Sequence, residues 1–435
     1  MKRLSAILAM MLFAVGLSAA ERDFVVSSAE ELHVLGTLRG GSEVVWRNGD
    51  YADEVITINA SGTAKNPVVV RAESDGGVRF TGKSLLRIKG SNIVVRGFVW
   101  DNPTLEKGVV VSFDRASSHS LLEECVIKGD RSEMRPANNI KWVSVWGYRN
   151  RVERCSFIDK RDLGQILIVR LAKDEKSPQH IVRNCYFTRP KSLLNEKGGR
   201  INGQCCIRFG TSDVAQQQAE CVVENCYFDR CNGEGEIISS KSCGNVFRNN
   251  LFYKSNGSLT LRHGNNSQVL NNYFIGKNAP LSAGVRIVGE GHTIRGNYFE
   301  QLQLRTYGAI HMIMGQENAT AGGYQQVKGV TISENTIVDC ACGITAHNAR
   351  HKDSVMPILS TTVERNIVVI RDEGCSVASE NGDHDIAWRD NIVYGGTQRG
   401  VSLAEVDTAP KCRKVGAITE KISTAAGATF MKHKK

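Results

Sequence analysis

The chain has 435 residues, and its 55 Lys and Arg residues exceed its 45 Asp and Glu residues, which gives a formal net charge of +10. A basic surplus favours polyanionic partners, but no zinc-finger, basic-helix or aromatic RNA-binding signature is present, which argues against nucleic acid. The length exceeds what one ordinary hydrophobic core supports, so the chain must either form two domains or repeat a structural unit.

The N-terminus has the features of a secretory signal peptide. Lys2 and Arg3 precede an apolar run at 4–17, and small residues at 18–20 lead to Glu21. The run is shorter than a membrane-spanning helix, and no Cys follows it to accept a lipid. We therefore expect 1–20 to be removed, which takes away Lys2 and Arg3 and lowers the charge from +10 to +8. The mature protein is expected to be periplasmic or secreted, without a membrane anchor.

The next segment, 21–45, is expected to form an N-terminal cap. Ser27 and Glu30 fit the capping box of a helix N-terminus, so we predict a short helix that runs to Leu38. Such a helix would cover the exposed end of the repeat structure that follows, since an open solenoid end needs a cap.

A repeat runs through the rest of the chain, in which a Cys or Asn is followed two residues later by an aromatic or branched residue. Most steps between repeats are 22 to 31 residues long, and the repeat position falls at Cys125, Cys155, Cys185, Cys226, Asn250, Asn272, Asn297, Asn335, Asn366 and Asn391. This period is typical of a parallel β-helix with one coil per repeat, and the fixed leucines of leucine-rich repeats are absent. We predict an all-β, single-domain, right-handed parallel β-helix at 46–405, with 406–435 as a C-terminal cap or tail.

The 13 cysteines of an exported protein raise the question of a disulfide framework. The four at the repeat position are expected to be buried free thiols, while the Asn side chains stack on those of the next coil, about 4.8 Å away. The sequence cannot assign a disulfide among the others, which include Cys205, Cys206, Cys231, Cys243, Cys340, Cys342, Cys375 and Cys412. No paired Cys-x-x-Cys knuckle occurs, so zinc is not expected.

Two acidic residues alternate with glycine in the segment that begins at Gly233. In extended chain Glu234 and Glu236 point the same way. Two neighbouring carboxylates repel unless a cation lies between them, and calcium prefers oxygen ligands. The alternative interpretation is a solvated acidic turn.

A basic pair follows from the repeat spacing. Lys241 lies nine residues before Asn250, and Arg262 lies ten residues before Asn272. The two cations should therefore lie on one face of adjacent coils, where their repulsion lowers the lysine pKa towards that of a base. The alternative is a structural salt bridge from Lys241 to Glu236. We expect Arg208, one coil before, and Arg286, one coil after, to extend a basic stripe that would track a polyanion.

At these residues the chain resembles polysaccharide lyase family 6, which contains the alginate lyases and chondroitinase B. The resemblance rests on Asn225-Cys226-Tyr227-Phe228, on Gly233-Glu234-Gly235-Glu236-Ile237-Ile238-Ser239-Ser240-Lys241-Ser242 and on Leu259-Thr260-Leu261-Arg262-His263-Gly264. Asn202-Gly203 and Ile207-Arg208-Phe209-Gly210 match the upstream ligand strand of the family. Weaker similarity covers 29–396, and the fold of the family is the right-handed β-helix predicted from the period.

The resemblance implies a role for each matched residue. Asn202, Glu234 and Glu236 are implied to hold Ca²⁺, although Gln204-Cys205-Cys206 stands where the family usually has Gly-Glu-Thr. Lys241 is implied to be the base, and Arg262 the acid or charge stabiliser. The implied substrate contacts are His263 and Arg286, joined by Arg208 from the basic stripe and by His311, which is equally consistent with an ordinary inward or surface histidine.

We therefore expect an enzyme that cleaves an acidic, uronate-containing polysaccharide by calcium-assisted β-elimination. Alginate is favoured over dermatan sulfate because 406–435 leaves no room for the extra domain of larger members. A glycoside hydrolase would place two carboxylates on opposite sides of the bond, whereas Glu234 and Glu236 lie on one strand. A non-catalytic glycan-binding solenoid would explain the basic stripe alone. The sequence defines neither the oligomeric state nor the preference for mannuronate or guluronate.

Overall fold

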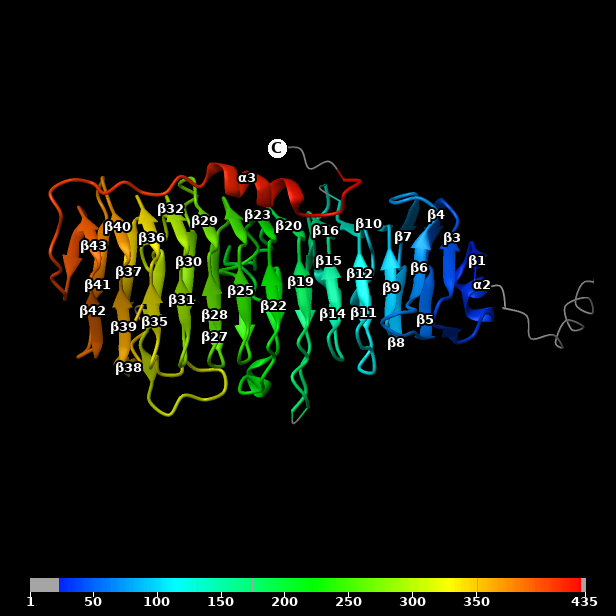
Figure 1. Ribbon diagram of the computed structural model, residues 1–435, viewed down its shortest axis with the longest axis horizontal. Helices are drawn as coiled ribbons and strands as arrows, with labels where there is room; N and C mark the ends of the chain where they lie inside the picture. Colours follow the sequence, from blue (N-terminus) through cyan, green and yellow to red (C-terminus); the bar gives the residue numbers. More distant parts are fainter. Residues whose placement is uncertain (1–22, 131, 174, 350, 432–435) are drawn as a thin grey trace, which may run out of the picture.

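The computed structural model describes residues 23–130, 132–173, 175–349 and 351–431. The expected signal peptide at 1–20 lies outside these residues. The described chain winds into a parallel β-helix, in which sheets of 14, 13 and 15 strands run along the long axis of the molecule (Figure 1). Successive coils add one strand to each sheet, so the predicted fold class is confirmed. No helix in the described ranges is long and apolar enough to span a membrane.

The 15-stranded sheet carries the candidate site. Along the solenoid its strands are β2 (Leu38–Arg39), β5 (Val55–Ser61), β8 (Leu85–Ser91), β11 (Lys107–Phe113), β14 (Arg135–Val145), β18 (Leu167–Val169), β21 (Ile207–Phe209), β24 (Glu236–Lys241), β27 (Gly257–His263), β30 (Ser282–Ile287), β33 (Ile310–Ile313), β37 (Cys342–His347), β41 (Cys375–Ser379) and β44 (Thr397–Arg399), with β17 (Asp162–Leu163) paired to β14.

The other two long sheets complete each coil. The 14-stranded sheet comprises β1 (Asp23–Val26), β3 (Glu43–Trp46), β6 (Val68–Ala72), β9 (Ile93–Arg96), β12 (Leu121–Glu123), β15 (Arg151–Glu153), β19 (Ile181–Arg183), β22 (Val222–Glu224), β25 (Val246–Arg248), β28 (Gln268–Leu270), β31 (Thr293–Arg295), β35 (Thr331–Ser333), β39 (Thr361–Glu364) and β42 (Ile386–Arg389). The 13-stranded sheet comprises β4 (Gly49–Ala52), β7 (Val78–Thr81), β10 (Phe98–Asp101), β13 (Val126–Lys128), β16 (Ser156–Ile158), β20 (Tyr186–Arg189), β23 (Tyr227–Cys231), β26 (Leu251–Tyr253), β29 (Tyr273–Ile275), β32 (Tyr298–Glu300), β36 (Thr336–Val338), β40 (Ile367–Val369) and β43 (Ile392–Tyr394).

The predicted repeat position is the interior corner between these two sheets. It follows a residue in the left-handed conformation, such as Asn249 at φ 55° and Asn271 at φ 54°, which short polar side chains tolerate. The Asn250 amide donates to Asn272 Oδ1 at 2.9 Å, and that oxygen also accepts the Asn250 backbone N–H at 3.0 Å. The same amide contact continues through Asn297, Asn335, Asn366 and Asn391.

Where the corner residue is Cys, the thiol fills the interior as predicted. Cys125, Cys155, Cys185 and Cys226 are buried, and each of the 13 cysteines, all within the described ranges, is a free thiol. Two residues further on, rings stack from coil to coil at centroid distances of 4.5 to 5.0 Å through Phe157, Phe187, Phe228, Phe252, Phe274 and Phe299.

The N-terminal cap differs from the prediction. Helix α2 (Ala29–Val34) begins one residue later than expected, because Ser28 is its N-cap and accepts the Glu31 N–H at 3.1 Å. Glu31 in turn accepts the Ser27 N–H at 2.6 Å. The helix ends at Val34, before Gly36 at φ 67°, and Leu38 is already in a strand. The first sheet strand starts at Asp23, so coils begin inside the segment expected to be cap.

The C-terminal segment runs back along the solenoid. We call 406–431 the C-terminal strap. Its helix α3 (Gly416–Ala425) lies along the outer face of the 13-stranded sheet (Figure 1). Val415 and Ile422 pack there on a cluster that includes Leu251, Ile275 and Tyr298. Beyond α3, the Thr429 N–H donates to Glu124 at 2.6 Å, many coils from the end of the solenoid.

Candidate active site

The candidate site lies on the outer face of the 15-stranded sheet, on β21, β24, β27 and β30. The structure corrects the predicted single basic stripe. Arg208 pairs with Ser239 and Thr260 pairs with Arg286, so these positions form one row. Irregularities in the pairing of β24 with β27 follow Glu236 and Ser240, and Lys241 pairs with His263. Lys241 and Arg262 therefore belong to a second row, about two residues further along the strands than Arg208 and Arg286.

Lys241 is half-buried at the end of β24. Its ammonium donates to Ser212 Oγ at 3.3 Å, from the short 3-10 helix η1 (Ser212–Val214). Burial lowers the pKa of Lys241, and the charges of Arg262 and Arg208 lower it further, while Glu236 opposes them. No ion pair joins Lys241 to a carboxylate among the described residues, so the alternative salt bridge to Glu236 is not formed.

Arg262 is held in a cradle made by the long insertion before β35. Its guanidinium donates to the carbonyl oxygens of Gly322 at 2.9 Å and Gly323 at 3.1 Å. It also lies 4.4 Å from the ring centroid of Tyr324. These three contacts fix the plane of the guanidinium while its Nε lies 3.9 Å from Glu236 Oε1.

Arg286, on the next coil, meets the same carboxylate. Its Nη2 donates to Glu236 Oε1, and its Nη1 lies 3.2 Å from the hydroxyl of Tyr307. Glu236 therefore bridges Arg262 and Arg286 through one oxygen. Its other oxygen, Oε2, makes no hydrogen bond or ion pair within the described ranges.

Glu234 is anchored by backbone amides. Its carboxylate accepts the N–H of Gly203 at 2.9 Å and of Cys205 at 2.6 Å. Burial raises the pKa of Glu234, and the charge of Glu236 raises it further. Asn202 is exposed and directly precedes Gly203, so the three predicted calcium ligands converge on one region.

This donor set fits calcium, which prefers carboxylate and amide oxygens. Two carboxylates close enough to raise a pKa gain stability from a cation between them, and Glu236 retains one oxygen for it. The described residues contain no group of three or more His, Cys, Asp or Glu side chains arranged to hold a metal. A calcium site here therefore depends on Asn202 and on oxygens from solvent or substrate.

A buried arginine supports the turn before Glu234. Arg189 donates to the carbonyl oxygens of Asp162 at 2.6 Å, Gly164 at 2.9 Å and Gln204 at 3.0 Å. Gly233 packs so closely on this group that a Cβ would lie 2.4 Å from the Gln204 oxygen. Two residues that depart from the family pattern thus belong to the scaffold behind the carboxylates. Gln204 accepts from Arg189, and Cys205 donates its backbone N–H to Glu234.

The two predicted histidines are buried. Neither ring nitrogen of His263 has a hydrogen-bond partner in the described part of the chain, and burial lowers the pKa of His263 to about 3. His311 is covered by Tyr307 and His347 and lies 2.9 Å from Thr345 Oγ1 through its Nδ1. Burial also lowers the pKa of His311, so both rings are neutral near pH 7.

Four further residues belong to this face and were not predicted. Tyr307 lies in the turn between β32 and β33, and Tyr324 lies in the insertion before β35; neither segment has a periodic signal. Lys141 and Arg170 extend the basic surface upstream of Arg208, because both Arg170 and Arg208 lower the pKa of the half-buried Lys141. The strand periodicity could have identified Lys141, since it faces outward in β14.

A parallel β-helix with cations, a carboxylate pair and a half-buried amine on one sheet face is suited to an anionic polysaccharide. The family model for chondroitinase B matches residues 25–403. The chain belongs to this family, which is polysaccharide lyase family 6. No curated protein shows significant similarity to the chain.

Solved structures agree with this assignment. The chain is 26% identical to a mannuronic acid specific family 6 lyase from human gut microbiota, with a TM-score of 0.76 over 94% of this chain and 96% of that one. It is 28% identical to the family 6 alginate lyase AlyGC, with a TM-score of 0.78 over 93% of this chain but only 56% of AlyGC. A family 6 alginate lyase in complex with a trisaccharide, 24% identical, has the same fold, with a TM-score of 0.74 over 91% of this chain and 90% of that one.

Proposed function

We propose that the chain cleaves alginate by β-elimination, with Lys241 as the base and Arg262 as the charge stabiliser. The observation that carries this proposal is the environment of Lys241. Its amine is half-buried and close enough to Arg208 and Arg262 to feel their charges. It forms no ion pair with a carboxylate within the described residues. These conditions lower the pKa of Lys241 and favour the neutral form that a base requires.

The reaction begins with the proton at C5 of a uronate, which is weakly acidic because the adjacent carboxylate is charged. Lys241 accepts this proton through its neutral amine. Arg262, held by the Gly322 and Gly323 carbonyls, stabilises the negative charge that develops near the carboxylate or the leaving oxygen. Arginine rarely gives up a proton, so its role is electrostatic.

Asn202, Glu234 and Glu236 would hold calcium in this proposal. Bound calcium would offset the charge of the substrate carboxylate and act as a Lewis acid. The Gly203 and Cys205 amides fix Glu234, and Arg286 orients Glu236, so both carboxylates are held in position. Arg208 and Arg286 contact uronate carboxylates on neighbouring sugars.

Alginate is the proposed substrate because two similar structures above 25% identity are described as mannuronic acid specific and as an alginate lyase. Dermatan sulfate is the second candidate, because the matching family model is that of chondroitinase B. Export to the periplasm or the medium through 1–20 is part of the proposal. N-terminal sequencing of the mature protein should then begin near Glu21.

The test is ultraviolet absorbance on separate mannuronate, guluronate and dermatan polymers, with calcium present. If the absorbance of unsaturated uronate ends rises with an alginate polymer, the proposal is supported. If it rises with dermatan alone, the assignment moves to the second candidate. Reducing ends without unsaturation would indicate a hydrolase, and binding without cleavage would indicate a non-catalytic solenoid.

A further inference from the structure

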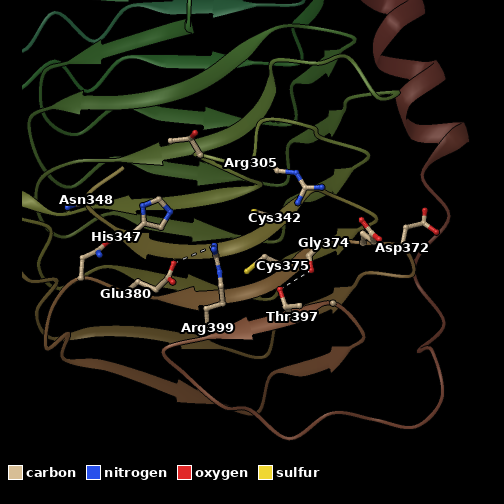
Figure 2. Close-up of a pocket in the computed structure, with 14 residues that line it drawn as sticks. Arg305, Cys342, His347, Asn348, Asp372, Gly374, Cys375, Glu380, Thr397 and Arg399 are labelled. Atoms are coloured by element: carbon tan, nitrogen blue, oxygen red, sulfur yellow. Dashed lines mark hydrogen bonds and ion pairs between the residues drawn. The ribbon is translucent and has the colours of Figure 1, made fainter. Parts of the chain in front are cut away.

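A pocket opens further along the same 15-stranded sheet, towards the C-terminal end of the solenoid. Its volume is about 630 Å³, and strands β37, β41 and β44 contribute Cys342, Cys375 and Arg399 to its lining (Figure 2). Arg305 and Glu380 also line it. The proposed lyase reaction uses none of these residues.

The two cysteines are positioned as a pair. Cys342 and Cys375 are the first residues of β37 and β41 and are direct partners in the parallel pairing. Both are free thiols that line the pocket, and the Cys375 thiol donates to the Val377 carbonyl oxygen at 3.2 Å. Paired residues on neighbouring strands lie about 4.8 Å apart, which is within the Cα separation of roughly 4.4–6.8 Å that a disulfide spans. The backbone therefore needs no large movement to bring the two sulfur atoms into bonding distance.

The two thiols of the pair differ in acidity. The neighbouring Cys342 thiol lowers the pKa of the Cys375 thiol, and Arg399 lowers it further against the effect of burial. The Cys375 thiol in turn raises the pKa of Cys342. Arg399 is oriented by Glu380, 3.4 Å from its Nη2 (Figure 2). The pair thus joins a more acidic thiol, which forms the nucleophilic thiolate more readily, to a less acidic one.

The other cysteines lack this combination. Burial raises the pKa of Cys125, Cys155 and Cys185, which lie in the apolar interior of the solenoid. Cys412, in the C-terminal strap, is more exposed than any other cysteine, but burial raises its pKa as well. Among the described thiols, only Cys342 and Cys375 are direct strand partners that also line an open pocket beside an arginine.

We propose that Cys342 and Cys375 form a redox-active pair that a small peroxide converts to a disulfide. The Cys375 thiolate attacks one peroxide oxygen, the O–O bond breaks, and the second oxygen leaves and takes a proton from solvent. Cys375 is then a sulfenic acid. The Cys342 sulfur attacks the Cys375 sulfur, the S–O bond breaks, and the Cys342 proton leaves with the hydroxide as water. Two thiols are oxidised and one peroxide is reduced.

The disulfide would tie together two coils near the C-terminal end of the solenoid. In the last coil, β42 and β44 contain no buried residue and β43 contains one, Val393. The bond would link residues 33 positions apart (375 − 342), and closing such a loop restricts the unfolded chain. We expect the oxidised protein to have a thermal midpoint a few degrees above that of the reduced protein.

The experiment treats the reduced, folded full chain with hydrogen peroxide, alkylates the remaining thiols, and maps the peptides by mass spectrometry. The expected product lacks two hydrogen atoms and joins the Cys342 and Cys375 peptides. In Cys342→Ser the reaction should stop at the Cys375 sulfenic acid, which dimedone traps. Arg399→Gln should slow disulfide formation several-fold, while Cys412→Ser, a matched control at the more exposed thiol, should leave its rate unchanged.

Faster oxidation at Cys412 or at the interior cysteines than at this pair would overturn the proposal. So would the absence of a dimedone adduct on Cys375 in folded Cys342→Ser. The readout is the mass of named peptides, so the result is the same whether or not the chain cleaves alginate.

Discussion

Two outer faces of the same solenoid have opposite properties. The face of the 13-stranded sheet is apolar around Leu251 and Ile275 and is covered by the C-terminal strap. The face of the 15-stranded sheet carries Lys241, Arg262 and Arg286, and the Nε atoms of Arg208 and Arg286 are buried without a hydrogen-bond partner in the described ranges. Unpartnered buried polar groups cost stability, so the second face is organised for a ligand and the first for the fold.

This difference predicts that substitutions on the two faces separate turnover from stability. Changes on the site face should alter cleavage while leaving the thermal midpoint nearly constant. Changes under the strap should do the reverse.

The largest effect is expected at Lys241. Both Lys241→Ala and Lys241→Arg should lose turnover by about 10³-fold or more, because removing a general base costs on the order of 10²–10⁴-fold and arginine stays protonated at any working pH. Polymer binding should persist. Initial rates of unsaturated-end formation measure the loss, with Lys421→Ala on exposed α3 as a control. Substantial turnover by Lys241→Arg would exclude Lys241 as the base and direct attention to His263.

Chelation of calcium should have the next largest effect. Cleavage should fall by about 10²-fold or more, since a Lewis acid contributes several kcal/mol to the transition state. The thermal midpoint should stay within a few degrees, because the coils are held by their own apolar core and by the stacked Asn side chains at the interior corner. Parallel rate and melting measurements test this separation. A large loss of folded structure on chelation would show that calcium holds the fold instead.

A smaller effect is expected at Tyr324, whose ring faces Arg262 at 4.4 Å. Tyr324→Ala should lower kcat/KM about tenfold, because a partly desolvated cation–π contact contributes roughly 1–2 kcal/mol. Tyr324→Phe keeps the ring and should retain most activity. If both variants lose activity equally, the hydroxyl is required and the ring does not position Arg262.

The pH dependence of cleavage should move with the charges around Lys241. The rate should rise with pH as Lys241 loses its proton, with a midpoint below the ordinary lysine value, because burial and the arginine charges lower its pKa. Arg208→Gln removes one of these charges, so the pKa of Lys241 should rise. The rising part of the pH–rate profile should then shift to higher pH. Profiles of kcat/KM against pH measure the shift. A shift to lower pH would contradict the proposed coupling.

The sequence predicted most of the fold because a solenoid repeats one local rule. Asn250, Asn272 and their equivalents mark the interior corner of each coil, so the period alone located the coils and the buried cysteines. The capping helix was displaced by one residue because Ser27 and Ser28 can both act as N-cap. The strap was not predictable, since its contacts with Glu124 and Leu251 join segments far apart in the chain.

The site was predicted less completely than the fold. The spacing of the Asn positions placed Lys241 and Arg262 on one face, but the pairing of Arg208 with Ser239 and of Arg286 with Thr260 puts these two arginines in a separate row. The irregular pairing after Ser240 also sets Lys241 opposite His263. A one-residue irregularity in a strand leaves almost no mark on composition, yet it changes which side chains are neighbours. Tyr324 lies in an insertion, where no period relates a residue to the strand face it covers.

The smallest effect on activity is expected under the strap, at Ile422. This side chain is only 7% exposed and packs on the cluster around Leu251, whereas Ile418 on the same helix is 40% exposed. Ile422→Ala should destabilise the fold by about 2 kcal/mol, because a large-to-small change leaves a cavity at a partly collapsible surface.

Ile418→Ala makes the same chemical change where there is little packing to lose, so its effect should stay within about 0.5 kcal/mol. Differential scanning calorimetry should therefore separate two variants of one helix. Their kcat/KM on alginate should equal that of the parent, because α3 lies on the sheet that carries no site residue. If Ile422→Ala lowers kcat/KM while the protein remains folded, the two faces are coupled through the coils, and the division of stability from function between them does not hold.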